Sequence, residues 1–375
     1  MIDPVKLAQE LVRIDTTGGG EERAARLCGD LLQRADAEVE VVPAGPGRAH
    51  LLAAVGNVAS RPLILSGHLD TVSADPDCWQ NNPWSGDLVD GELYGRGAAD
   101  MKGGVAALVA ALARQARAWK HERGVLLVLT ADEEAGCAGA KHLVRSRKLP
   151  AGGPMLVAEP TRLSIALGHK GALWLRATAR GRSAHGSAPH LGKNAITALA
   201  RFVLALEEGG LATTRSRSGG VTVNVGRFNG GTRINLVPDH ASAEIDLRTP
   251  AGLDSSALLE DISALAGPED IELEVLQDLA SVQTATGGPF YAMFSSLVRK
   301  VMGEASVREP LAYFTDAAVL SPALNSSEVL IFGPGDPGQA HTVDESCPVD
   351  HIQTATLVFE VLLQSWREQG QGELL

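Results

Sequence analysis

The most restrictive feature of this sequence is a set of short apolar runs that a chain can bury only as central strands of a sheet. The clearest is residues 124–130, and residues 62–66 and 155–158 have the same character. Strands covered on both faces are apolar throughout, as in parallel sheets. Helical patterns separate the runs, and the longest is the alanine-rich stretch 103–119. This alternation predicts an α/β fold with a doubly wound, mostly parallel sheet.

The pattern changes near residue 168, where apolar and polar residues begin to alternate along the strands. From there to residue 283 the predicted order is strand, helix, two strands, helix, strand, with a turn at residues 215–220. That order is the split βαβ arrangement of a ferredoxin-like module. A chain of 375 residues also exceeds what one hydrophobic core usually organises. We therefore expect one domain at 1–167 and 284–375, with an inserted α+β domain at 168–283.

Ionisable residues follow several of the predicted strands directly. His68 and Asp70 end the strand at 62–66, and at strand period they point to one side, where open α/β sheets place their ligands. Residues 132–134 are three adjacent carboxylates, which repel one another unless cations or solvent offset the repulsion. Glu159 and His341 follow two further strands. Taken singly, each group is more often a polar turn, a solvated helix start or a structural histidine.

A glycine-dense loop at residues 95–104 opens into the alanine-rich helix and contains Asp100. Asp100 is suited to cap that helix. A phosphate loop is excluded because the spacing G-x-x-x-x-G-K-[ST] is absent. Taken together, two histidines and three carboxylates from five segments suit a pair of borderline divalent ions with one bridging carboxylate. In such a site Asp70 is placed to orient the imidazole of His68.

In combination and order, these motifs resemble the co-catalytic zinc aminoacylase/carboxypeptidase family, which includes acetylornithine deacetylase, succinyl-diaminopimelate desuccinylase and bacterial glutamate carboxypeptidase. The resemblance runs over nearly the whole chain. It is carried by residues 66–70, 95–103, 132–134, 159–161 and 340–341. It implies a metal-dependent amidohydrolase with two Zn²⁺ ions per chain, for which Co²⁺ or Mn²⁺ are alternatives.

The resemblance also implies a role for each residue of the site. The implied ligands are His68 and Glu159 in one site, Glu134 and His341 in the other, and Asp100 between the two. Asp70 would orient His68, and Glu133 would be the general base that takes a proton from water and delivers it to the leaving amine. The peptide bond after Asp100 is expected to be cis.

Three motifs in the inserted domain extend the resemblance. His185, in residues 181–186, resembles the histidine of the family's dimerisation (lid) domain. This implies a homodimer in which His185 reaches the partner's active site and stabilises the oxyanion. Asn235 lies in a stretch similar to the substrate-binding loop, and Arg248 is expected to hold a substrate carboxylate bidentately. A surface histidine and a surface strand arginine are the alternatives for His185 and Arg248.

Fewer residues indicate which substrate the enzyme hydrolyses. In this family a glutamate at position 159 goes with deacylases and carboxypeptidases, which favours a substrate with a free carboxylate. At position 170 the sequence resembles acetylornithine deacetylase, because it has Lys170 where the desuccinylase has an arginine. Asp316, or its neighbour Thr315, is a candidate contact for a cationic substrate side chain, and helix capping is the alternative for Asp316.

We therefore expect hydrolysis of a small N-acyl amino acid or dipeptide-like substrate, with N-acetylornithine as the first candidate. The alternatives are a succinyl-diaminopimelate desuccinylase, a glutamate carboxypeptidase or dipeptidase, and a catalytically inactive binding protein.

Composition excludes several other classes of function. The net charge of -12 argues against a nucleic-acid partner and against an anionic membrane. The four cysteines have no paired spacing and are expected to be reduced. The first residues lack the apolar core of a signal peptide, and no apolar run approaches the roughly 20 residues of a membrane helix. A cytoplasmic enzyme is the expectation.

Overall fold

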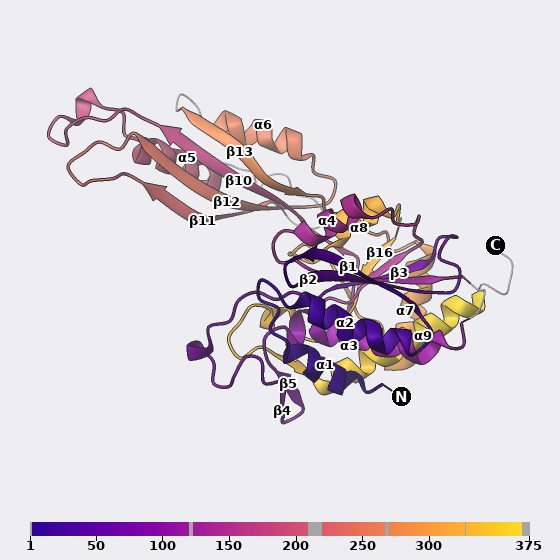
Figure 1. The fold of residues 1–375 in the computed structure, drawn as a ribbon. Helices are drawn as coiled ribbons and strands as arrows, with labels where there is room; N and C mark the ends of the chain where they lie inside the picture. Colours follow the sequence, from indigo (N-terminus) through magenta and orange to yellow (C-terminus); the bar gives the residue numbers. More distant parts are fainter. Residues whose placement is uncertain (1, 120–122, 209–219, 267–269, 327, 370–375) are drawn as a thin grey trace. The chain divides into compact units, whose positions relative to one another are not determined.

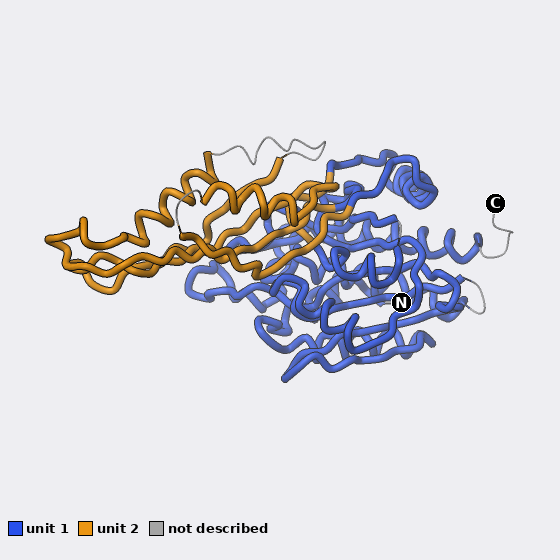
Figure 2. The backbone as a smooth tube through the Cα atoms, turned by 90° about the horizontal axis from the view of Figure 1, so that it is seen from above, with its two compact units in different colours: residues 1–168, 283–309, 315–375 blue, residues 169–282, 310–314 orange. Residues whose placement is uncertain are grey.

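The computed structural model of the protein describes residues 2–119, 123–208, 220–266, 270–326 and 328–369. The predicted turn at 215–220 lies outside them except for Gly220. The chain divides into two units (Figure 2). Unit 1 comprises Met1–Gly168, Gln283–Glu309 and Thr315–Leu375, and unit 2 comprises His169–Val282 and Pro310–Phe314.

Unit 1 contains an eight-stranded sheet in the order β1-β2-β6-β3-β7-β16-β8-β15. Its strands are β1 (Glu38–Gly45), β2 (Arg48–Val55), β3 (Leu63–His68), β6 (Val125–Thr130), β7 (Met155–Val157), β8 (Ile165–Ala166), β15 (Val307–Arg308) and β16 (Val329–Ile331). The four central strands β6, β3, β7 and β16 are mutually parallel. Every residue of these four is buried, which explains why their sequences are apolar runs.

Helices cover both faces of this sheet (Figure 1). One face carries α1 (Pro4–Val12), α2 (Glu21–Gln33), α3 (Gly103–Ala116), α7 (Pro289–Met302) and α9 (Val349–Gln369), and the other carries α4 (Ala138–Ser146) and α8 (Ala317–Ala323). A small antiparallel sheet of β4 (Asp87–Val89), β5 (Glu92–Tyr94) and β17 (Ser346–Pro348) completes the unit. The predicted doubly wound α/β class is confirmed.

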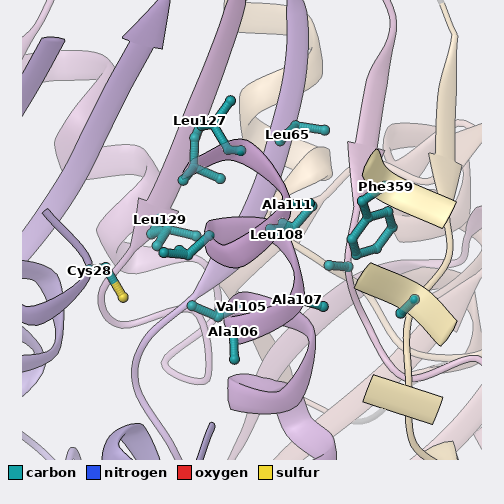
Figure 3. Packing of buried hydrophobic residues seen from close by; sticks show 14 of the residues in the cluster. Cys28, Leu65, Val105, Ala106, Ala107, Leu108, Ala111, Leu127, Leu129 and Phe359 are labelled. Atoms are coloured by element: carbon teal, nitrogen blue, oxygen red, sulfur yellow. The ribbon is translucent and has the colours of Figure 1, made fainter. Parts of the chain in front are cut away.

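The alanine-rich helix α3 lies at the centre of the core, between the sheet and α9 (Figure 3). Leu108 of α3 is buried with Leu127 and Leu129 of β6 and with Phe359 of α9. The small side chains of α3 let the helix approach the backbone at the end of β7 closely. At Gly104, an added Cβ would lie 2.0 Å from the carbonyl oxygen of Ala158, just after β7. The sequence of α3 therefore places the start of the helix against the carboxyl ends of the central strands.

Unit 2 is a four-stranded antiparallel sheet in the order β11-β12-β10-β13. Its elements in chain order are β10 (Gly171–Arg180), α5 (Ala195–Glu208), β11 (Thr222–Gly230), β12 (His240–Thr249), α6 (Ser255–Leu265) and β13 (Ile271–Leu279). Buried and partly exposed residues alternate along β12, because α5 and α6 cover one face of the sheet. This order and topology confirm the predicted ferredoxin-like module.

The short strands β9 (Gly168–His169) and β14 (Val282–Gln283) lie where the chain crosses between the units. The observed units differ from the expected domain limits in two respects: residues 168 and 283 belong to unit 1, and residues 310–314 belong to unit 2. The Leu311 carbonyl accepts a hydrogen bond from the Lys170 amide, and Phe314 packs edge-to-face on Trp174. These contacts join sequence-distant residues and leave no pattern in the sequence. Within the described residues, no helix has the length and apolar character needed to cross a bilayer.

Candidate metal centre

The predicted ligands of unit 1 gather at one edge of the large sheet. Because β6, β3, β7 and β16 are adjacent and parallel, their carboxyl ends meet there. His68 is the last residue of β3, Glu133 and Glu134 follow β6, and Glu159 follows β7. His341 arrives on the loop after β16. Parallel topology thus brings together side chains that lie up to 273 residues apart, from His68 to His341.

Asp100 lies between the two histidines. Its Oδ1 is 3.1 Å from Nε2 of His68, and its Oδ2 is 3.4 Å from Nε2 of His341. Each imidazole also faces a glutamate. Nε2 of His341 is 2.9 Å from Oε1 of Glu134, and Nε2 of His68 is 3.8 Å from Oε1 of Glu159. One carboxylate that presents its two oxygens to two imidazole–carboxylate pairs is the arrangement that a ligand bridging two metal ions requires.

The backbone around Asp100 is unusual. The residue lies in the turn η2 (Ala98–Lys102), which follows Gly97 at a φ of 83°, and its own backbone is non-helical, with φ -118° and ψ 93°. The peptide bond from Asp100 to Met101 is cis, as the resemblance predicts. The alternative role of Asp100 as the cap of α3 is wrong, because Lys102 occupies the position before Gly103 and no side chain caps this helix. The Asp100 carboxylate instead faces the histidines.

Asp70 connects the end of β3 to the loop after β6. Its Oδ1 accepts a hydrogen bond from the amide of Glu133 at 3.1 Å, and its Oδ2 accepts one from the amide of Glu134 at 3.0 Å. Nδ1 of His68 lies 3.0 Å from the backbone oxygen of Asp70 and 3.6 Å from its Oδ1. Since a carbonyl oxygen only accepts, His68 carries a proton on Nδ1, which leaves Nε2 available to a metal in the neutral imidazole.

Protons occupy this cluster in the metal-free protein. Hydrogen bonds to Asp100 and then Glu134 raise the pKa of His341 to about 10. Burial by itself would lower the pKa of His68, but hydrogen bonds to Asp100 and Asp70 raise it well above its usual value. Burial would raise the pKa of Asp100, and the two histidines hold it well below the usual range instead. A divalent cation binds such nitrogen and oxygen atoms by displacing these protons.

The donor set fits borderline divalent ions. Ligand atoms of His68, Asp100 and Glu134 all lie within 4.8 Å of one another. Imidazole nitrogens and carboxylate oxygens are the ligands of catalytic zinc sites, with similar affinity for other first-row metals. Glu159 is 3 % exposed, and burial, followed by the nearby Asp100 carboxylate, raises its pKa well above the usual range. A buried carboxylate of this kind is stabilised when a cation replaces its proton.

Glu133 lies beside the ligands but points into a second acidic cluster. With Cys137 and Asp316 it forms a buried group whose polar atoms lie within 4.8 Å of one another. Burial raises the pKa of Glu133 well above its usual range; His68 opposes this effect, and the Asp316 carboxylate adds to it. A carboxylate with a raised pKa is suited to accept and return a proton near neutral pH.

Asp316 does not have the capping role considered for it, because its side chain makes no capping hydrogen bond to α8. It is 3 % exposed, as is the predicted ligand Glu159. Oδ2 of Asp316 accepts a hydrogen bond from the hydroxyl of Thr130 at the end of β6. The capping contact belongs to Thr315, whose Oγ1 accepts a hydrogen bond from the amide of Ala317 at 3.1 Å. Thr315 is itself fully buried.

Two of the predicted residues of unit 2 lie side by side. His185 forms an isolated bridge with Leu236, and the amide of Gly186 donates to the backbone oxygen of Asn235 at 2.8 Å. Both His185 and Asn235 are exposed. Nδ1 of His185 accepts a hydrogen bond from the amide of Ser187 at 3.2 Å, so its neutral form carries the proton on Nε2. The ring therefore presents an N–H donor outward.

Arg248 and Lys170 are held by other groups within unit 2. Nε and Nη2 of Arg248 donate to Oδ2 of Asp246 at 3.1 and 3.0 Å, and its guanidinium lies 5.0 Å from the ring centre of Phe314. The ammonium of Lys170 donates to the backbone oxygen of Gly220 at 2.9 Å, and the residue is 8 % exposed. Arg248 is thus a preoriented cation on a strand, whereas Lys170 is largely enclosed.

Two buried ionic residues, Lys102 and Glu345, lie near the predicted metal ligands, and no pattern in the sequence marks them. Lys102 donates to the backbone oxygen of Ile14 at 2.9 Å, and burial lowers its pKa to about 8. The carboxylate of Glu345 is fully buried against the turn that carries Asp100. Neither residue stands at the end of an apolar run, so the reasoning that finds the ligands does not reach them.

Comparison with known proteins places the chain among metallopeptidases. The family model described as Peptidase family M20/M25/M40 matches residues 64–365. A probable succinyl-diaminopimelate desuccinylase from Staphylococcus epidermidis is 29 % identical over 98 % of both chains. A probable carboxypeptidase from Aspergillus terreus is 34 % identical over 66 % of this chain and 61 % of its own length.

Two solved structures share the fold. An M20 metallo-carboxypeptidase from Sulfolobus solfataricus aligns with a TM-score of 0.82 at 19 % identity, covering 98 % of this chain and 100 % of its own. A dinuclear metal-binding peptidase of the M20 family from Bacillus subtilis aligns with a TM-score of 0.74 at 16 % identity, covering 97 % and 98 %. At these identities the likeness concerns the fold alone.

Proposed function

The chain belongs to peptidase family M20/M25/M40, a family of metal-dependent hydrolases, and on that premise we propose that it hydrolyses the amide bond of a small N-acyl amino acid with two zinc ions. The observation that carries this proposal is the position of Asp100 between His68 and His341, each of which faces its own glutamate. The Bacillus subtilis relative in fold, described as a dinuclear metal-binding peptidase, supports the count of two.

In this proposal His68 and Glu159 would hold one ion, Glu134 and His341 would hold the other, and Asp100 would be shared by both. When bound, the ions lower the pKa of a water molecule and polarise the amide carbonyl. Asp70 keeps the ligand His68 in the tautomer that exposes Nε2, because its carbonyl accepts the Nδ1 proton. Asp70 also fixes the loop of Glu133 and Glu134 through their two amides.

Glu133 acts as the general base. Its buried carboxylate, whose pKa is raised, accepts a proton from the water molecule whose oxygen adds to the amide carbon, and returns the proton to the leaving nitrogen as the C–N bond breaks. His185 is proposed to stabilise the oxyanion from the partner of a homodimer, because its neutral ring presents an outward Nε2–H. The edge strand β11 of unit 2, which carries an exposed Phe228, is the surface we assign to dimerisation.

We assign recognition of the substrate carboxylate to Arg248, with Asn235 as a second polar contact. Asp246 and the ring of Phe314 hold the Arg248 guanidinium in one orientation, which limits the side-chain entropy lost on binding an anion. Lys170, whose ammonium donates to the backbone oxygen of Gly220, favours an acetyl group only through the resemblance to acetylornithine deacetylase. N-acetylornithine remains the first candidate, with Asp316 or its neighbour Thr315 as the candidate contact for its cationic side chain.

N-succinyl-diaminopimelate is the second candidate. The observation that favours it is the name of several Staphylococcus relatives, probable succinyl-diaminopimelate desuccinylases, which are 27–29 % identical over at least 92 % of this chain. A desuccinylase must bind an additional carboxylate on the acyl group. A panel of N-acetylornithine, N-succinyl-diaminopimelate, an N-acetyl apolar amino acid and a dipeptide separates the candidates. Cleavage of the dipeptide alone would refute both.

A pair of variants tests the site itself. Glu133→Gln should lower kcat by about 10²–10⁴ while leaving two metal ions per chain, because a base is lost and no ligand. Glu134→Gln changes the adjacent residue in the same way and should lower both metal content and kcat. Metal content is measured by elemental analysis after loading with Zn²⁺. Loss of metal in Glu133→Gln would contradict its role as base, and a wild-type chain that binds less than one ion would refute the enzyme.

A further inference from the structure

Glu345 is a buried carboxylate that lies next to the metal ligands without being one of them. Its Oε1 accepts hydrogen bonds from the amides of Ala99 at 2.9 Å and Asp100 at 3.0 Å. Its Oε2 accepts one from the amide of Gly97 at 3.0 Å and one from Nη1 of Arg96 at 2.7 Å. Four donors therefore converge on this single side chain, which has no exposed surface.

The amides that Glu345 accepts belong to the turn that presents Asp100. The turn η2 begins directly after Gly97, whose φ is 83°, and Asp100 within it has a non-helical backbone. Gly97 has no side chain of its own to accept the amides of this turn, and the carboxylate of Glu345 accepts those of Gly97, Ala99 and Asp100. Because an unpaired buried amide is unfavourable, the carboxylate of Glu345 stabilises this conformation of the turn over other conformations.

Glu345 also belongs to the segment that carries His341. Its own backbone oxygen accepts a hydrogen bond from the amide of Gly95 at 2.9 Å. Glu345 thus joins the loop of Asp100 to the loop of His341 through both its backbone and its side chain, although Asp100 and Glu345 are 245 residues apart. The joined loops supply the two ligands whose atoms, Oδ2 of Asp100 and Nε2 of His341, lie 3.4 Å apart.

We propose that Glu345 is a positioning residue of the metal centre, which aligns Asp100 with His341 before metal binds. This inference rests on the proposed dinuclear site. Outer groups that orient metal ligands typically change metal affinity or activity by about 10–100-fold when they are altered. Loss of the carboxylate would also leave buried amides unpaired and lower the stability of the fold, so metal affinity is the quantity that separates positioning from stability. Fixing one geometry of the turn is the role that its four contacts support.

The substitution Glu345→Gln removes the charge and one acceptor oxygen but keeps the volume of the side chain. Each oxygen of Glu345 accepts two donors, so in either amide orientation the NH₂ group of glutamine faces two N–H groups. Half of the hydrogen bonds are lost while the side chain keeps its size. We expect the metal-free variant to bind Zn²⁺ about 10–100-fold more weakly than the wild type. Titration against a chromophoric chelator measures this affinity without any turnover.

Glu328→Gln is the matched control. The carboxylate of Glu328 also accepts backbone amides, those of Phe290 at 3.1 Å and Tyr291 at 3.2 Å, at the start of α7. The same chemical change there should lower the melting temperature of the metal-free protein but leave its Zn²⁺ affinity unchanged. A destabilised Glu345→Gln protein that binds Zn²⁺ as tightly as Glu328→Gln would overturn the inference, because its role would then be stability only.

A milder variant covers the case in which Glu345→Gln does not fold. Glu345→Asp keeps the charge and both oxygens but is one methylene shorter, so it should weaken Zn²⁺ binding by less than Glu345→Gln. Wild-type affinity in Glu345→Asp would then overturn the inference. A wild-type protein that fails to bind Zn²⁺ would instead refute the proposed function, so the two failures are distinguishable.

Discussion

Replacing Asp70 by asparagine tests whether one carboxylate organises both the base and a ligand. Its two oxygens accept the amides of Glu133 and Glu134 separately, at 3.1 and 3.0 Å, and the residue is 4 % exposed. In Asp70→Asn the side-chain NH₂ must face one of these amides. Asparagine keeps the volume and one acceptor oxygen of Asp70. Any change in stability therefore comes from the loss of the second acceptor and of the charge.

The structure sets the size of the expected effect. A hydrogen bond to a charged group contributes about 1.5–3 kcal/mol, and a buried amide left without an acceptor costs about 1–3 kcal/mol. The two figures overlap, because the lost bond and the unpaired amide concern the same contact. We therefore expect the free energy of unfolding of the metal-free protein to fall by about 3 kcal/mol. Turnover should fall about 10–100-fold as well, since the base and ligand loop loses its anchor.

The stability change is best measured by urea unfolding at pH 7 followed by tryptophan fluorescence. Four of the five tryptophans lie in unit 1, so the signal reports on the unit that holds Asp70. Burial would raise the pKa of Asp70, but hydrogen bonds from His68 and the two amides lower it below 3.8. The stabilisation by a carboxylate with a lowered pKa is complete above its unfolded pKa. The difference between variant and wild type should therefore shrink only as the pH falls below about 3.8.

Asp3→Asn provides the matched control in the same unit. Oδ1 of Asp3 also accepts two backbone amides, those of Val5 at 2.9 Å and Lys6 at 3.3 Å, but the residue is exposed at the start of α1. Asparagine caps a helix about as well as aspartate, so stability should change by less than about 0.5 kcal/mol. If Asp70→Asn is no less stable than Asp3→Asn, the reasoning about the buried carboxylate is refuted.

Three further predictions concern metal binding, the core and the dimer. Zn²⁺ binding at pH 7 should release protons, because neighbouring carboxylates raise the pKa of His341 to about 10; calorimetry that finds no dependence on buffer ionisation enthalpy would contradict this. Gly104→Ala, whose Cβ would lie 2.0 Å from a carbonyl oxygen, should destabilise by about 1–3 kcal/mol in urea unfolding, whereas the unobstructed Gly287→Ala should not. His185→Ala and Glu133→Gln should each be inactive and regain activity in mixed dimers; exchanged dimers without activity would exclude action across subunits.

Much of the fold was predictable because its signals are local. An apolar run such as β6 reports burial on both faces, and the alternation along β12 reports burial on one. The ligands follow from the same signals, because His68 and Glu159 each lie at or just after the end of such a run. Parallel strands bring their carboxyl ends to one edge, so the positions of these residues in the sequence already predict their proximity.

Local sequence patterns thus predict the α/β class, the inserted ferredoxin-like module and the candidate metal ligands. The contacts of each candidate residue are visible only in the folded chain. The tertiary structure placed Asp316 in a buried cluster, assigned the first contact of His68 Nδ1 to the Asp70 carbonyl, and set Glu345 beneath Asp100. The physical reason is that hydrogen-bond partners depend on atoms brought together from distant segments, whereas burial and periodicity are written in neighbouring residues.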